Sequence, residues 1–288
     1  MAPKALRKLG IADAVKQHAQ SFKDLGDIAL SEIIADTGPS SLRNFPLFLR
    51  NTDTILRAAS GVDPDDFVFC LGGECALIVG SMAAFKTRFK GTPGVLWIDA
   101  HGDFNTPETT ISGFIGGMCL ALACGRGPKL TSSIEKTRPL LREENLVHVG
   151  SRSLDPLESE IMQASSLRSY SASEVHKAGA SEIAREAARY LAERSDWIVC
   201  HIDVDAIDPT VISAVNFQEQ GGLTLEETRI VVRELFRTQK VKAIILAGYN
   251  PLLDQNNYSG NELVKLTSQI LIADNSIDPA AQSLGNRT

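Results

Sequence analysis

The chain has 288 residues, of which 43% are hydrophobic and 22% are charged, and its formal net charge at pH 7 is −6. This composition is ordinary for a globular protein and excludes the disordered and fibrous classes. An acidic chain without a long run of Lys or Arg is a poor partner for nucleic acid. The length suits one large α/β domain, so we interpret residues 1–288 as a single domain.

The five cysteines form no CxxC pair, so neither a disulfide framework nor a structural zinc site is indicated. No apolar run approaches the roughly 20 residues that a transmembrane helix needs. The first residues are charged and lack the apolar core of a signal peptide. We therefore expect a cytoplasmic protein that has no membrane partner.

Short apolar runs rich in β-branched residues predict buried parallel strands at residues 67–71, 95–98, 146–149, 197–202 and 243–246. Helical patterns lie between and after these runs, at residues 76–89, 116–123, 173–194, 224–236 and 262–272. Ser173 and Thr224 are the predicted N-caps of two of these helices, and Glu227 completes a capping box with Thr224. The alternation predicts an α/β fold with a mostly parallel central sheet.

Acidic residues follow two of the predicted strands. Asp99, His101 and Asp103 come directly after residues 95–98, at alternate positions that point to one side of the chain. In an open parallel sheet, ligands bind beyond the carboxyl ends of the strands. This first cluster therefore stands where a binding site is expected.

A second cluster, Asp203 and Asp205, follows the strand predicted at residues 197–202. Four carboxylates and one imidazole at the same edge of a sheet would repel one another unless cations lay among them, and such ligands suit Mn²⁺ or Mg²⁺. Two ions that share carboxylates could hold a water as hydroxide for attack on an electrophilic carbon, which indicates metal-assisted hydrolysis. Helix capping or a solvated turn is the alternative interpretation of each cluster taken alone.

Three segments resemble the signature blocks of the arginase and agmatinase (ureohydrolase) family. They are Gly72-Gly73-Glu74-Cys75, residues 99–107 and residues 203–209, and the supporting matches are residues 109–113, residues 221–224 and Asn250-Pro251. The resemblance implies a three-layer α/β/α sandwich, two Mn²⁺ ions per chain and a homo-oligomer, either a trimer or a hexamer. It also implies a small-molecule substrate.

By position, the resemblance implies that the metal-binding residues are Asp99, His101, Asp103, Asp203 and Asp205, with Asp99 and Asp203 bridging the ions. Asp103 also matches the residue that assists proton transfer, which makes it the candidate catalytic residue. The matching residues that would hold the amino-acid end of a substrate are Asn105, Thr110, Ser112, Asp155 and Glu158. The implied reaction is hydrolysis of a guanidino C–N bond by a metal-bridging hydroxide.

Three positions depart from the family pattern. Cys75 stands in place of a metal-binding histidine, and it is interpreted either as a thiolate ligand or as a buried thiol without a ligand role. Gly116 stands in place of a proton-shuttling histidine, and Gly248 in place of a glutamate that pairs with the guanidinium. A buried planar cation such as a guanidinium needs a carboxylate partner, and Gly248 supplies none. This departure argues against ordinary arginine hydrolysis.

These departures leave two alternatives to a guanidino hydrolase. One is a hydrolase of a modified or neutral C–N substrate, such as an N-hydroxyguanidine, formimidoyl or amide compound. The other is a catalytically silent homologue that keeps the fold for assembly or binding. Residues 2–8 match a stretch that in relatives follows a first strand, so the chain is expected to begin after that strand.

The remaining histidines are interpreted as structural. His18 and His176 are expected on amphipathic helices, and His148 and His201 within strands.

Overall fold

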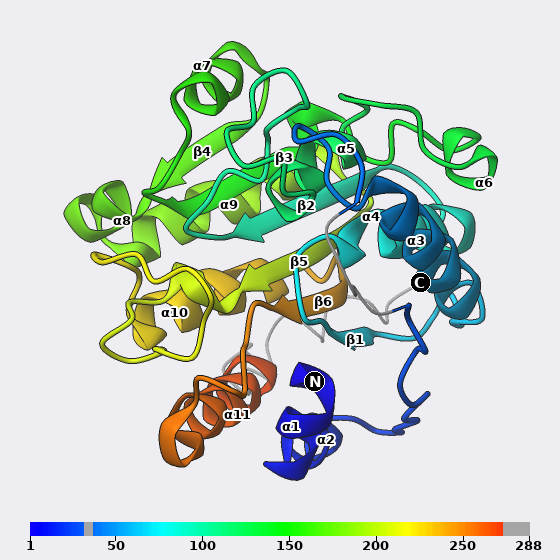
Figure 1. Cartoon of the computed structure of the whole chain (residues 1–288). Helices are drawn as coiled ribbons and strands as arrows, with labels where there is room; N and C mark the ends of the chain where they lie inside the picture. Colours follow the sequence, from blue (N-terminus) through cyan, green and yellow to red (C-terminus); the bar gives the residue numbers. More distant parts are fainter. Residues whose placement is uncertain (32–36, 273–288) are drawn as a thin grey trace, which may run out of the picture.

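The computed structural model describes residues 1–31 and 37–272, and its centre is one sheet with the strand order β1-β6-β5-β2-β3-β4 (Figure 1). The strands are β1 (Val68–Leu71), β2 (Pro93–Ile98), β3 (Leu146–Ser151), β4 (Arg168–Ser171), β5 (Trp197–Asp203) and β6 (Val241–Ala247). All neighbouring pairs are parallel. The sequence predicted every strand except β4, whose short segment RSYS carries no apolar run.

In the part of the chain that the structure describes, three helices precede the first strand, and the others connect the strands or follow the last of them. They are α1 (Ala2–Lys8), α2 (Ile11–Lys16), α3 (Phe45–Ala59), α4 (Leu77–Arg88), α5 (Cys119–Ala123), α6 (Ser132–Glu135), α7 (Pro156–Ala164), α8 (Ala172–Ala178), α9 (Ala180–Arg194), α10 (Leu225–Phe236) and α11 (Tyr258–Leu271). Short 3₁₀ turns lie at Gly116–Met118, Glu143–Asn145, Val204–Ala206 and Gln255–Asn257. The predicted helix at residues 173–194 is in fact two helices, because Gly179 at φ 91° interrupts it.

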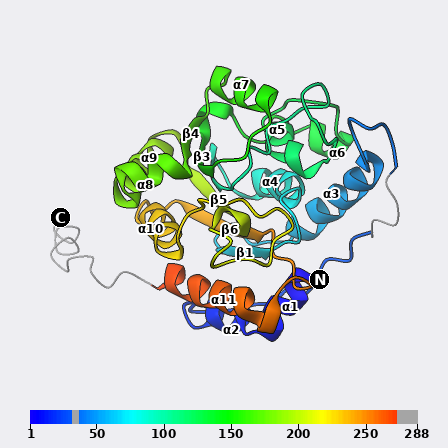
Figure 2. The same cartoon turned by 60° about the vertical axis from the view of Figure 1, so that its left-hand side comes forward.

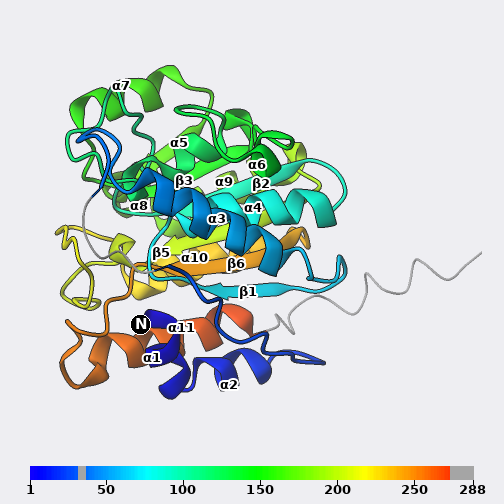
Figure 3. The ribbon, with the colours of Figure 1, turned by 45° about the vertical axis from the view of Figure 1, so that its right-hand side comes forward.

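The helices cover both faces of the sheet, which confirms the predicted three-layer α/β/α sandwich (Figures 2 and 3). Successive residues of a strand point to opposite faces. Leu96 and Ile98 therefore pack into the core on the side of α9, α10 and α11. Val95 and Trp97 pack into the core on the side of α4 and α5.

Strand β1 lies at one edge of the sheet and pairs with β6. In the described ranges 1–31 and 37–67 the chain forms helices α1, α2 and α3 but no strand. Helices α1 and α2 pack against α11, and Leu6 and Ile11 join the core on that side. Whether the chain lacks the family's first strand, as the resemblance implies, stays a prediction.

The histidine placements are confirmed in three cases. His148 lies in β3, His201 in β5 and His176 in α8, whereas α2 ends at Lys16, so His18 lies beyond a helix and not on one. Within the described ranges, no helix has both the length and the apolar character that a membrane crossing requires.

Helix α8 offers a matched pair of serines for testing its N-cap. Ser171 caps the helix, since its hydroxyl accepts a hydrogen bond from the Glu174 backbone N–H, while the predicted cap, Ser173, is an exposed residue of the first turn. The sequence placed the cap two residues too late because both positions are serine. We expect Ser171→Ala to lower the free energy of unfolding by about 1 kcal/mol.

Ser173→Ala is the control, and it should change stability by less than about 0.5 kcal/mol. Urea unfolding of both variants measures the difference. Equal losses in the two variants would contradict the assignment of the cap.

Candidate metal centre

The two acidic clusters meet at the carboxyl ends of β2 and β5, which are neighbours in the middle of the sheet. Ile98 pairs with Ile202, so Asp99 and Asp203 follow these strands side by side. The sheet register therefore brings together carboxylates that are more than a hundred residues apart in sequence.

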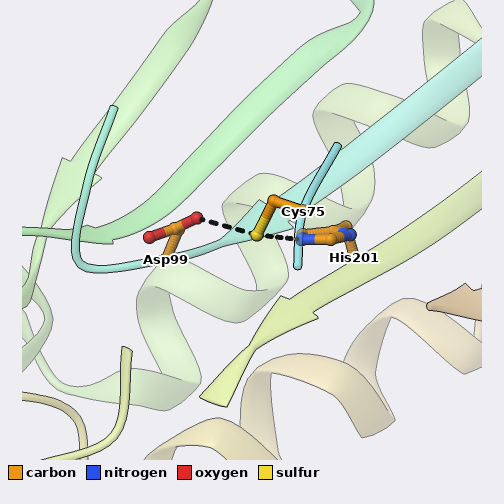
Figure 4. A group of neighbouring side chains, drawn as sticks. All are labelled: Cys75, Asp99 and His201. Atoms are coloured by element: carbon orange, nitrogen blue, oxygen red, sulfur yellow. Dashed lines mark hydrogen bonds between the residues drawn. The ribbon is translucent and has the colours of Figure 1, made fainter. Parts of the chain in front are cut away.

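The loop after β1 reaches the same point across the end of β6. Its first residue, Gly72, donates a backbone hydrogen bond to Leu246 O at 2.8 Å. The loop then places Cys75 Sγ 2.8 Å from Asp203 Oδ2 and 3.7 Å from Asp99 Oδ2. The thiol thus lies between the carboxylates of Asp203 and Asp99, and Figure 4 shows its contact with Asp99.

Asp99 is the residue that two groups of candidate ligands share. One group is Cys75, Asp99 and His201, and the other is Asp99, His101 and Asp205, each with its ligand atoms within 4.8 Å of one another. His101 Nδ1 lies 3.2 Å from Asp205 Oδ2 and 3.5 Å from Asp99 Oδ1. A carboxylate between two such groups is suited to bridge two cations.

Backbone and indole N–H groups hold these carboxylates in place. Asp99 accepts hydrogen bonds from Trp97 Nε1 at 3.0 Å and from the His101 backbone at 2.7 Å. Asp203 Oδ1 accepts one from the Asp205 backbone at 2.9 Å. The aspartates are therefore oriented by local turns that repeat after both strands.

Asp103 lies in the loop after β2, in a left-handed conformation at φ 49°. Its Oδ2 lies 3.5 Å from Cys119 Sγ, and its backbone carbonyl accepts from Leu120 N and Ala121 N at the start of α5. Asp103 is buried, and the charges of Asp99 and Asp203 act on it directly. The residue therefore joins the same charged centre.

The carboxylates carry more negative charge than the described side chains compensate. Burial, together with repulsion between neighbours, raises the pKa of Asp103 well above its usual range and raises the pKa of Asp203 to about 7. Burial lowers the pKa of His101, but its hydrogen bonds to Asp205 and Asp99 outweigh burial and raise it to about 11. One imidazolium cannot balance four carboxylates, so the donor set fits divalent cations.

The residues assigned to the amino-acid end of a substrate lie beside this centre in two groups. Asn105 Nδ2 donates to Asp155 Oδ2 at 3.1 Å, and Asp155 and Glu158 form the capping box of α7. Glu158 is buried and accepts from the Phe104 backbone at 2.9 Å, and burial raises its pKa to about 7. Glu158 thus supports the loop that carries Asn105.

Thr110 and Ser112 lie on the neighbouring loop, where their hydroxyls accept from Gly113 N at 2.9 Å and Phe114 N at 3.2 Å. Ser112 is exposed, so its hydroxyl is accessible to a ligand. The hydrogen bonds shape a turn that presents both side chains. Their role in binding stays a prediction.

At two of the three positions that depart from the family pattern, the structure shows which atoms lie where a side chain would begin. At Gly116, a Cβ atom would lie 2.5 Å from the ring of Phe114, so this ring fills the space beside the glycine. At Gly248, with φ 86°, a Cβ atom would lie 2.1 Å from Asp203 Oδ1. The second glycine therefore allows the backbone after β6 to approach a carboxylate of the centre.

Arg152 is an important residue that the sequence analysis missed. It follows β3 and donates hydrogen bonds to backbone carbonyls, among them Asp205 O at 2.7 Å and Glu219 O at 2.8 Å. It thereby ties the strand end that carries Asp205 to the loop in which Glu219 lies 4.0 Å from His101 Nε2. Its position three residues after the strand predicted at residues 146–149 was a signal that could have found it.

Phe217 was also missed, and no sequence signal marks it. Its ring centroid lies 5.9 Å from that of His101 and 6.4 Å from that of Phe114. Both phenylalanines are more than a third exposed, with relative accessibilities of 55% for Phe217 and 37% for Phe114. They form an apolar wall beside the candidate centre.

His148, which contacts the backbone of His101, allows a test of how the stability of the protein depends on pH. It is fully buried, and its Nε2 lies 2.7 Å from His101 O. Burial lowers its pKa to about 4. The unfolded chain takes up this proton near pH 6.5 and the folded chain only near pH 4, so stability is lost as the pH falls between these values, by about 3 kcal/mol.

We expect His148→Gln to remove this contribution, as measured by urea unfolding between about pH 7 and pH 4, and to leave the contribution of His201, whose pKa is lowered by burial to about 3. His176→Gln is the control, because His176 is a surface histidine whose pKa is raised by its hydrogen bond to Glu227. Its loss should leave the acid destabilisation in place. The same slope in wild type and His148→Gln would contradict a neutral buried imidazole.

Fold and site together define an α/β enzyme with a candidate metal centre at the carboxyl ends of parallel strands. The sequence profile of the Arginase family matches residues 1–273. The chain belongs to the arginase family, and the predicted family and enzyme class, a hydrolase of the ureohydrolase type, are confirmed.

Individual relatives agree with this membership. The arginase of Bacillus caldovelox is 31% identical over 273 residues, which cover 94% of this chain and 91% of the relative. An arginase of Staphylococcus aureus (strain MRSA252) is 31% identical over 92% of this chain and 89% of its own length. The native structure of the B. caldovelox arginase superposes with a TM-score of 0.88 at 30% identity, covering 95% of this chain and 92% of the other.

Proposed function

We propose that this protein is a metal-dependent hydrolase that cleaves a C–N bond of a guanidino (amidino) compound. The observation that carries the proposal is Asp99, which belongs to both groups of candidate ligands and so is placed to bridge two cations. Membership of the arginase family supports the reaction class. We propose Mn²⁺ as the cation, two per chain, in a cytoplasmic homo-oligomer.

The candidate ligands are Cys75, Asp99, His101, Asp103, Asp203 and Asp205. Bound cations would neutralise the carboxylates, polarise the substrate and lower the pKa of a water to near neutrality. Asp103 is our candidate for proton transfer, because its carboxylate is buried beside the others. A buried carboxylate beside the reacting atoms would accept a proton from the attacking water and pass it to the leaving amine.

The neighbouring polar groups would bind and orient the substrate. Asn105 and Asp155 offer an amide and a carboxylate to an α-amino-acid end, and Thr110 and Ser112 offer hydroxyls from the adjacent loop. Glu158 acts through the backbone of Phe104 and through α7, so its role is positioning. Fixing a substrate by its remote end orients the reacting carbon.

A second candidate function is the hydrolysis of a modified or neutral C–N substrate, such as an N-hydroxyguanidine, a formimidoyl compound or an amide. Two observations favour it. Gly248 supplies no carboxylate for a guanidinium, and Phe114 with Phe217 presents an apolar wall beside His101. An unpaired cation would be costly against such a wall, whereas a neutral group would not.

The experiment is to count bound metal per chain after dialysis against Mn²⁺ and then to follow product release from a panel of substrates. Close to two ions and turnover of arginine, agmatine or another guanidino compound would support the first proposal. Two ions with turnover of only the neutral or modified compounds would establish the second. Metal-free, inactive protein that remains folded would contradict both and identify a catalytically silent homologue.

A further inference from the structure

The thiol of Cys75 is part of a closely packed group at one side of the candidate centre. His201 Nε2 lies 3.1 Å and Asp99 Oδ2 3.7 Å from Cys75 Sγ (Figure 4). Asp203 Oδ2 lies 2.8 Å from the same sulfur. The sulfur is therefore surrounded by one nitrogen and two oxygen ligand atoms. This arrangement brings three kinds of donor to one point.

The ring of His201 is buried, and its hydrogen-bonding capacity is only partly used by the described residues. It is fully buried in β5, its ring stacks on Trp97 at a centroid distance of 3.7 Å, and its Nδ1 has no hydrogen-bond partner among the described residues. Buried polar side chains are almost always satisfied by a partner. The sequence analysis interpreted His201 as structural, but the structure aims its Nε2 at the sulfur of a candidate ligand.

Ligand chemistry distinguishes the two groups that share Asp99. His101 and Asp205 supply one imidazole and a carboxylate, which together with other oxygens suit Mn²⁺. Cys75 and His201 supply a thiolate and an imidazole, which suit Zn²⁺ or Co²⁺ better than Mn²⁺. The two positions therefore differ in the cations that they favour.

We propose that His201 and Cys75, together with Asp99 and Asp203, form a mixed sulfur, nitrogen and oxygen site that selects a thiophilic divalent cation, so that the centre holds two different metals. This inference rests on the proposed function only in requiring that the centre binds cations. Binding releases the Cys75 proton to solvent and leaves a thiolate. His201 would bind as the neutral imidazole that its buried position favours.

The test is the near-ultraviolet absorption of the full chain titrated with Co²⁺, because a cobalt–thiolate bond gives an intense charge-transfer band. We expect the band in wild type and its loss in Cys75→Ser. Elemental analysis should show that Cys75→Ser still binds cobalt, which we expect at the His101 position. Cys119→Ser is the matched control: Cys119 is also a buried thiol beside an aspartate, 3.5 Å from Asp103 Oδ2, and its variant should keep the band.

His201→Gln should keep the fold, measured by circular dichroism, and weaken cobalt binding at this position by about tenfold or more, about 1.4 kcal/mol. In competition, one equivalent of Zn²⁺ should displace one of two bound Mn²⁺ ions and leave the other. Cobalt that binds wild type without the band would overturn this inference and leave the proposed function standing. Wild type that binds no cobalt, zinc or manganese would overturn both.

Discussion

Removing divalent cations with a chelator should lower the melting temperature of this protein by roughly 10 °C. A ligand present at about a thousand times its dissociation constant stabilises the folded state by about 4 kcal/mol, and each kcal/mol shifts the melting temperature of a chain this size by about 2–4 °C. The loss arises because Asp99, Asp103, Asp203 and Asp205 then face one another, and the nearby cations of the described residues, His101 and Arg152, balance only part of their charge. Differential scanning calorimetry before and after metal removal measures it.

The effect of the chelator should grow with pH. Without cations the pKa of Asp203 is raised from 3.8 to about 7, so the folded state holds a proton that the unfolded state has lost. The stability of the metal-free protein therefore falls as the pH rises from about 4 through about 7. Asp203→Asn removes this charge but leaves the group of Asp99, His101 and Asp205 intact. The metal-free variant should therefore melt no lower than metal-free wild type, and the chelator should lower its melting temperature less than it does in wild type. An unchanged wild-type melting temperature after verified metal removal would contradict the site.

The second large effect is expected at Gly248. Gly248→Ala should cost about 3 kcal/mol or more, because a residue with a side chain is strained at φ 86° and the new Cβ would lie 2.1 Å from Asp203 Oδ1. Gly248→Glu carries the same Cβ, so restoring the family's glutamate should disrupt the centre before it could pair with a guanidinium. Urea unfolding of the metal-free proteins measures both.

Gly221→Ala is the matched control for backbone strain alone. Gly221 has φ 75°, but no atom lies within 4 Å of its added Cβ. We therefore expect a loss of only about 1 kcal/mol. A loss at Gly248 as small as that at Gly221 would show that the backbone can move away from Asp203.

Much of the fold was predictable, because buried parallel strands have a direct sequence signal. The apolar runs around Leu96, Ile198 and Ile245 mark the central strands, and acidic residues directly after two of them locate the candidate centre. β4 and α7 were missed for the opposite reason. β4 begins at Arg168 and α7 at Pro156, both in mixed, largely polar stretches. Packing stabilises both elements, and the Asp155 capping box stabilises the start of α7.

The three-dimensional contacts between side chains distant in sequence could not be predicted in the same way. Nothing in the sequence indicates that Nε2 of His201 lies 3.1 Å from the sulfur of Cys75, since the contact depends on a loop that crosses the end of a third strand. The same holds for Phe114, whose ring occupies the space beside Gly116. Motif positions predicted the candidate ligands, but the neighbours that alter their chemistry come from the packing.

The separation of the candidate ligands along the chain has a consequence for folding kinetics. Cys75, Asp99 and Asp203 are carried by β1, β2 and β5, so the centre is assembled only when strands distant in sequence have paired. Strands so far apart in sequence pair late and slowly, because closing the long loops costs entropy before the new contacts offset that cost. Cations would then stabilise the native state without stabilising earlier states, so bound metal should slow unfolding more than it speeds folding. The lifetime of the folded chain, more than the rate at which it forms, would depend on the supply of metal.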